Sequence, residues 1–342
     1  MNSLSIILPT RNCLQELLAT ERELFEWLEY GTEVICVDSH STDGTREWLQ
    51  SFCANHPSAC LIDHPPGLYA SWNAGISQSS GDWIHIATAG DTVLADGGSH
   101  LLEVGENHSA DIVISPPRMQ YSDLQIAQVR WPVHDMVESL CNDNTFHELD
   151  SKEKKFWFFA FLPSTPLGSS ASNLYRGSFL RAKLFPTNAG HAGDSLWALK
   201  NANQAKIILT SKVCARFNVA TSGSGKEVSA HIQWGLFSKS VELAREMLVE
   251  YEATQAEKNL LDSVWGPKIE LWEWLASIEK SEIEIKNVLE EQLSYISILE
   301  KEKMRLLDEV ERLSKVPLTD IIPPIKMSHI SSLMRFILNL RR

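Results

Sequence analysis

The chain has 342 residues, more than one ordinary domain, and its 44% hydrophobic and 22% charged residues are typical of a globular protein. The formal net charge of -13 argues against a large nucleic-acid surface, because such surfaces depend mainly on Lys and Arg. The six cysteines form no C-x-x-C pair, which favours a reducing compartment. With no charged-then-apolar leader and no apolar run of membrane-spanning length, the sequence predicts a soluble, cytoplasmic protein.

Four short apolar runs bounded by turn residues occur in the first 115 residues, and helix-patterned stretches separate the earlier ones. They cover residues 5–8, 33–37, 83–87 and 111–115. This alternation is typical of an α/β fold with a parallel sheet, in which ligands bind beyond the carboxyl ends of the strands. We therefore expect the residues directly after each run to form the functional site.

The residues after the first two runs suit a nucleotide. The first run leads into Pro9-Thr10-Arg11-Asn12, and the second into Asp38-Ser39-His40-Ser41-Thr42-Asp43-Gly44-Thr45. Such turns offer oxygen acceptors to a base or ribose and backbone donors to phosphates. Each segment is also ordinary turn chemistry, so neither identifies a nucleotide site by itself.

A third segment makes the pattern specific. It reads Gly67-Leu68-Tyr69-Ala70-Ser71-Trp72-Asn73-Ala74-Gly75-Ile76, followed by Ser80-Gly81-Asp82 and a strand pattern that ends at Asp91. Together the segments resemble glycosyltransferase family 2, the inverting enzymes with a GT-A fold. Members typically show P-T-x-N, V-D-x-x-S-T-D-G-T, G-x-Y-x-x-x-N-x-G-I and S-G-D before an acidic strand end. The resemblance covers roughly residues 3–215.

The resemblance implies a nucleotide-sugar donor, with a UDP-sugar favoured, and usually a divalent cation, Mn or Mg. Carried over by position, Thr10 and Asn12 would line the nucleotide pocket and Asp38 would contact the base or ribose. Asn73 would support the donor site, and Asp91 would be the metal-facing carboxylate.

A candidate general base follows in the downstream half. A loop of small residues, Asn188-Ala189-Gly190-His191-Ala192-Gly193, leads into Asp194 and a helical pattern. The family places an acid there that deprotonates the acceptor hydroxyl, so the resemblance makes Asp194 the catalytic base. The alternative is that Asp194 only caps the helix.

Three positions depart from the family pattern. The strand end reads Thr88-Ala89-Gly90-Asp91 where the family more often has two or three acids. Ala70 stands where many relatives have Asp, and Ser39-His40 replaces the common Asp-Gly. We expect weak metal affinity, and a metal-independent enzyme or a nonproductive sugar-nucleotide binder also fits these residues.

Helical patterns dominate from about residue 226. Between residues 285 and 313 a seven-residue repeat has seven apolar residues at its nine seam positions, which predicts a coiled coil and self-association. The seam positions are Ile285, Leu289, Gln292, Ile296, Leu299, Lys303, Leu306, Val310 and Leu313.

The last residues form a basic amphipathic tail. Residues 321–342 hold four cations and no acid, and an apolar stripe consists of Ile330, Leu333, Met334, Ile337 and Leu338. Residues 326–342 could lie on the inner face of a membrane as an interfacial helix, or dock on their own or a partner subunit.

We therefore predict a GT-A-type mixed α/β sheet flanked by helices over residues 1–225, then a helical extension at 226–278, a coiled coil at 279–316 and the tail at 317–342. The predicted function is inverting transfer of a sugar to an acceptor hydroxyl, on a glycan or lipid-linked acceptor in cell-surface polysaccharide synthesis. The main alternative is a catalytically decayed sugar-nucleotide-binding subunit that assembles through its coiled coil. A nucleotidyltransferase is less favoured, because the turn at 9–12 is not a Gly-rich and basic phosphate loop.

Overall fold

The computed structural model describes residues 3–28, 31, 33–121, 125–141, 145–162, 164–219, 240–249 and 253–278. The chain divides into two compact units, Met1–Ile278 and Glu279–Arg342. The predicted boundary at residue 225, the coiled coil at 285–313 and the tail at 326–342 lie outside the described residues. The domain limits given above therefore stay predictions.

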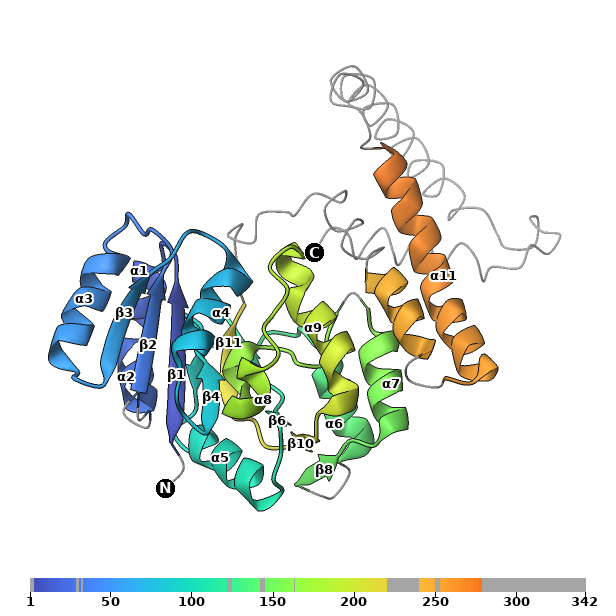
Figure 1. Cartoon of the computed structure of the whole chain (residues 1–342), viewed down its shortest axis with the longest axis horizontal. Helices are drawn as coiled ribbons and strands as arrows, with labels where there is room; N and C mark the ends of the chain where they lie inside the picture. The colour runs from blue at the N-terminus through green and yellow to red at the C-terminus, as the bar shows by residue number, and fades with distance from the viewer. Residues whose placement is uncertain are drawn as a thin grey trace, which may run out of the picture. The chain divides into compact units, whose positions relative to one another are not determined.

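The first unit is built on an eight-stranded mixed sheet, as predicted (Figure 1). Its strand order is β3-β2-β1-β4-β9-β6-β10-β8. Strands β3, β2, β1 and β4 are parallel neighbours, whereas β9 is antiparallel to both β4 and β6. The strands are β1 (Leu4–Thr10), β2 (Glu33–Asp38), β3 (Ala59–Asp63), β4 (Trp83–Ile86), β6 (Ile112–Ile114), β8 (Phe146–Glu148), β9 (Asn173–Arg176) and β10 (Ile207–Thr210).

A second sheet of three strands has the order β5-β11-β7. It comprises β5 (Thr92–Val93), β7 (Arg118–Gln120) and β11 (Ala215–Asn218). Strand β5 begins directly after the loop that follows β4, and β11 pairs with it in the antiparallel direction. The backbone after β4 is therefore tied to a strand more than a hundred residues further along the chain.

Helices cover both faces of the main sheet, because its central strands are apolar on both sides. Along β1, Ile7 packs into one buried cluster with α4, whereas Ile6 and Leu8 pack into the other with α1, α2, α3 and α5. The helices are α1 (Leu14–Ala19), α2 (Glu21–Leu28), α3 (Thr45–Asn55), α4 (Leu68–Gln78), α5 (Gly97–Asn107), α6 (Pro132–Leu140), α7 (Ser151–Ala160), α8 (Gly177–Arg181), α9 (Gly193–Asn201) and α11 (Gln255–Ile278), with short 3-10 turns η1 (Ser170–Ser172), η2 (Gly190–Ala192) and η3 (Ala202–Gln204).

The helical extension packs against the sheet domain. Helix α11 lies beside α7 (Figure 1), and its Trp265 is fully buried. The Trp265 indole N–H donates to the Phe159 carbonyl at 3.0 Å, and Lys155 Nζ lies 3.0 Å from Glu257 Oε1. Among the described helices, none is both long and apolar enough to cross a membrane.

The predicted runs at 5–8, 33–37, 83–87 and 111–115 correspond to β1, β2, β4 and β6. Strand β3 was not predicted, because it is a half-exposed edge strand whose residues are not continuously apolar. His85 is a core residue of the sheet domain. Its Nδ1 lies 3.1 Å from the Asn173 carbonyl oxygen, and its ring meets Trp27 edge-on at 4.8 Å.

On one face of the sheet, the close packing of α5 against α2 depends on Gly98. A Cβ added to Gly98 would lie 1.8 Å from the ring of Trp27, so a side chain at this position must displace α5 from α2.

We expect Gly98→Ala to lower the free energy of unfolding by about 2 kcal/mol or more. Urea denaturation measures the loss. The matched control is Ser99→Ala, an exposed neighbour on the same helix, which should change stability by less than about 0.5 kcal/mol. Equal effects of the two substitutions would contradict the packing described here.

Candidate active site

The carboxyl ends of β1 and β2 meet at one edge of the sheet. The two strands are parallel and in a register that pairs Thr10 with Asp38. The Thr10 hydroxyl lies 3.4 Å from an Asp38 carboxylate oxygen and 3.3 Å from the Val37 carbonyl oxygen. Both Thr10 and Asp38 are buried. The structure thus brings together two of the residues predicted from the first two motifs.

The turns after these strands are bonded to each other. Asn12 has a left-handed backbone, a conformation that Asn tolerates better than most residues, with φ of 47°. Its side-chain oxygen accepts from the Thr42 N–H at 2.8 Å, and its own N–H donates to the Ser41 hydroxyl at 2.9 Å. Asp43 accepts from the N–H groups of Leu14 and Thr45, both at 3.0 Å. Asn12 and Asp43 therefore fix the shape of the crevice.

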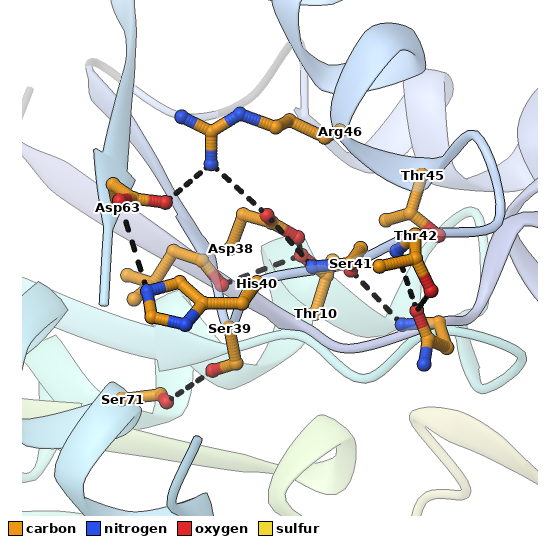
Figure 2. A network of polar contacts seen from close by, with 12 residues as sticks. Thr10, Asp38, Ser39, His40, Ser41, Thr42, Thr45, Arg46, Asp63 and Ser71 are labelled. Atoms are coloured by element: carbon orange, nitrogen blue, oxygen red, sulfur yellow. Dashed lines mark hydrogen bonds and ion pairs between the residues drawn. The ribbon is translucent and has the colours of Figure 1, made fainter. Parts of the chain in front are cut away.

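The negative charge of the buried Asp38 carboxylate is balanced by one arginine, Arg46. Figure 2 shows Arg46 of α3 between Asp38 and Asp63, the last residues of β2 and β3. Arg46 lies 3.3 Å from Asp38, which also accepts from the Ser41 N–H at 3.1 Å. The hydrogen bond from Arg46 holds the pKa of Asp63 below its ordinary value. His40, with φ of 56°, lies 3.8 Å from Asp63.

Helix α4 connects this crevice to the downstream half of the domain. The Ser71 hydroxyl lies 2.8 Å from that of Ser39 at the end of β2 (Figure 2). Two residues later, the Asn73 amide donates to the Phe185 carbonyl at 2.7 Å and accepts from the Phe185 N–H at 2.9 Å. Asn73 thus holds the 185–190 segment in place.

A cavity of about 480 Å³ opens at this edge of the sheet. Its size is within the usual range for small-molecule sites. It is lined by Pro9, Thr10, Arg11, Ser39, Pro66, Gly67, Leu68, Tyr69, Ser71, Trp72, Thr88, Thr187 and Gly190. These residues come from the ends of β1, β2 and β4, from the start of α4, and from the 185–190 segment that Asn73 holds.

Asp194 lies behind one wall of the cavity. It is in the first turn of α9, whose N-cap is Ala192, so Asp194 is not the capping residue. The hydroxyl of the cavity-lining Tyr69 hydrogen bonds to the Asp194 carboxylate, which also accepts from the Ser195 N–H at 2.7 Å. Asp194 is half-buried, and desolvation of its carboxyl group raises the pKa of Asp194 in spite of both hydrogen bonds.

Asp91 is buried and does not line the cavity. One carboxylate oxygen accepts from the Asn218 N–H on β11 at 3.0 Å, and the other from the Ser169 hydroxyl at 3.2 Å. Burial raises the pKa of Asp91 to about 7, although these two hydrogen bonds oppose the rise. In this arrangement Asp91 joins the loop after β4 to the second sheet.

The donor groups at the cavity do not fit a divalent cation. The described residues contain no cluster of three or more His, Cys, Asp or Glu side chains able to hold a metal ion. Among the described residues that line the cavity there is no carboxylate, the ligand on which Mg²⁺ and Mn²⁺ sites usually depend. Both oxygens of Asp91, the predicted metal-facing residue, already accept protein hydrogen bonds.

The residues predicted from the sequence therefore differ in how they lie relative to the cavity. Thr10 lines the cavity, Asp38 and Asn12 shape its floor and rim, and Asn73 positions a wall. Asp194 reaches the cavity through Tyr69, and Asp91 does not reach it. Several residues at the site had no predicted role, although one of them, Tyr69, lies within the G-x-Y motif. The residues without a predicted role are Arg11, Arg46, Asp63, Tyr69, Ser71, Trp72 and Thr88.

The fold and this site define a GT-A-type domain. The family model described as Glycosyl transferase family 2 matches residues 5–161. The chain carries a glycosyltransferase family 2 domain and is a glycosyltransferase, as its motifs predicted. The match ends before Asp194, so the downstream half depends on structural comparison.

Solved structures show the same fold at low sequence identity. The structure of S. aureus TarS 1-349 in complex with UDP-GlcNAc is 16% identical, with a TM-score of 0.59 over 83% of this chain and 77% of that one. The mannosyltransferase PcManGT from Pyrobaculum calidifontis, in complex with GDP-Man and Mn²⁺, is 16% identical, with a TM-score of 0.50 over 81% of this chain and 86% of that one. No curated protein sequence matches the chain significantly.

The burial of Asp91 predicts a pH-dependent stability. Because the folded state raises the pKa of Asp91 to about 7, the folded protein holds this proton more tightly than the unfolded chain. The stabilisation is complete below pH 4 and is lost as the pH rises through 7. Relative to Asp91→Asn, we expect wild type to lose roughly 2–4 kcal/mol of unfolding free energy between pH 4 and pH 8. Urea denaturation of both proteins across this range measures the difference, and a constant difference would refute the expectation.

Proposed function

We propose that the chain is an inverting glycosyltransferase that binds a nucleotide-sugar donor in the cavity at the ends of β1 and β2. Asp194 acts as the general base. The observation that carries the proposal is the hydrogen bond between Asp194 and Tyr69, because it couples a desolvated carboxylate to the wall of the cavity. The pKa of Asp194 is raised, which suits a group that must accept a proton.

The comparisons and the lining of the cavity support the proposed donor class. TarS is seen with UDP-GlcNAc and the Pyrobaculum mannosyltransferase with GDP-Man, so both structural relatives bind sugar nucleotides. The cavity of this chain offers hydroxyls from Thr10, Ser39 and Ser71 beside the aromatic Trp72. These groups suit the ribose and base of a nucleotide. A UDP-sugar remains the favoured donor.

The transfer is a single displacement at the anomeric carbon. The acceptor oxygen forms a bond to this carbon as the bond to the diphosphate oxygen breaks, and that electron pair leaves with the nucleoside diphosphate. The acceptor's hydroxyl proton passes to the Asp194 carboxylate. Because attack is opposite to the leaving group, the anomeric configuration inverts. Tyr69 and Ser195 orient the carboxylate.

The remaining predictions rest on the sequence and on the family resemblance. The acceptor is proposed to be a glycan or a lipid-linked acceptor in cell-surface polysaccharide synthesis, with the protein in the cytoplasm at the inner face of the membrane. Self-association through 285–313 and membrane contact through 326–342 stay predictions from sequence. A Mn or Mg cofactor stays a prediction of the family resemblance, and no step above uses it.

One observation favours a second function. The loop after β4 has lost the acids typical of the family, and its one acid, Asp91, is bonded to the protein on both oxygens. A site that has decayed in this way would suit a sugar-nucleotide-binding subunit without turnover. Hydrolysis or transfer assays over a panel of UDP-, GDP- and dTDP-sugars separate the two functions.

The general base is tested by Asp194→Asn in the full-length protein. We expect turnover to fall by about 10² to 10⁴-fold, because a positioned base contributes this much. Donor binding should stay within about threefold, since the carboxylate does not line the cavity. The control is Asp135→Asn, an exposed acid paired with Arg130 on α6, which should leave both quantities unchanged. Full turnover by Asp194→Asn would exclude Asp194 as the base.

The role of Tyr69 is tested by the pH dependence of turnover. Activity should rise with pH as Asp194 ionises, and Tyr69→Phe removes a hydrogen bond that favours the ionised form. We expect the acidic limb of the kcat profile to move up by roughly one pH unit. Tyr175→Phe removes the hydroxyl of a buried neighbour that does not donate to Asp194, and its limb should not move. If both variants lose activity without a shift, Tyr69 is only structural.

A further inference from the structure

The charges around the cavity are unusual for a metal-assisted site. Of the described residues that line it, Arg11 is the one charged side chain. No ion pair joins Arg11 to an acidic side chain in the part of the chain that the structure describes, and Arg11 is exposed at the turn after β1. The neighbouring acids are engaged elsewhere, since Asp38 and Asp63 both pair with Arg46.

The oxygen ligands that face the cavity are neutral. The loop after β4 contributes Thr88 to the wall, and the Thr88 hydroxyl lies 2.9 Å from that of Ser170. Gly90 has no side chain, and its φ of 87° takes the backbone through the left-handed region before Asp91 turns into the protein. A divalent cation at this wall would have no protein carboxylate to bind.

The start of α4 offers a second source of positive potential. Gly67 is the N-cap of this eleven-residue helix and has no side-chain capping bond, and both Gly67 and Leu68 line the cavity. The N–H groups of a helix's first turn have no partner within the helix and attract phosphates. Arg11 adds a full charge in a planar group that matches phosphate oxygens.

We infer that this site binds the diphosphate of its donor without a divalent cation, with the Arg11 guanidinium as the counter-charge and the first turn of α4 as a further donor. The inference rests on the proposed function for the identity of the ligand. When the sugar leaves, the departing diphosphate keeps the electron pair of the broken bond, and Arg11 stabilises the added negative charge. Arg11 thus takes the part that a bound cation takes in a metal-assisted transferase.

The test is calorimetric binding of UDP and, in parallel, GDP to the full-length protein, in EDTA and again in Mn²⁺. We expect the better-bound nucleotide to show dissociation constants within about twofold of each other in the two buffers. Arg11→Gln should weaken binding of this diphosphate by about tenfold and leave binding of the matching nucleoside unchanged. Arg22→Gln is the matched control, because Arg22 is an exposed arginine paired with Glu26 on α2, and it should bind like wild type.

Each contrary outcome has a definite meaning. Binding that is tighter by more than about twofold in Mn²⁺ overturns the inference and leaves the proposed transferase function intact. Diphosphate binding by Arg11→Gln equal to that of Arg22→Gln removes Arg11 as the counter-charge. Failure of both nucleotides to bind at millimolar concentration in either buffer overturns the inference and the proposed function together.

Discussion

The site depends on the parallel pairing of β1 with β2, in a register that places Thr10 beside Asp38. A slip of one residue would move alternate side chains to the opposite face and separate these two groups. The register is fixed because β1 packs side chains into the clusters on both faces of the sheet. The turns beyond the strands then meet, and Asn12 and Asp43 bond them into one rim. The shape of the cavity therefore follows from how the core packs.

Helix α4 links the end of β2 to Asp194 and to the 185–190 segment. Every second residue from Tyr69 to Asn73 bonds a different part of the domain. Tyr69 reaches Asp194, Ser71 reaches the end of β2, and Asn73 holds the 185–190 segment. A movement of this helix on binding the donor would therefore be felt by the proposed base. This connection gives the third family motif a physical reason, because each of its polar positions bonds a different part of the site.

Electrostatics distinguish this domain from the family pattern that its motifs resemble. The acid that remains after β4 binds β11 and Ser169, so it holds two sheets together and is not available to the cavity. Among the described residues that line the cavity, the one cationic side chain is Arg11. The described wall of the cavity thus offers a diphosphate one fixed cation, Arg11, and no carboxylate for a bound one. A site can exchange a bound cation for a fixed one when its ligand is a diphosphate.

The sequence by itself determined the apolar strands β1, β2, β4 and β6, and with them the α/β class and the order of the motifs. It also determined the residues of the crevice at the ends of β1 and β2, since parallel strands end at one edge. Only the tertiary structure decided where Asp91 and Asp194 point. Asp91 turns inward because β11, 127 residues away, supplies the N–H that it binds. Asp194 reaches the site because α4 brings Tyr69 to it. Such contacts join segments that are far apart in the sequence, and the local sequence pattern carries no information about them.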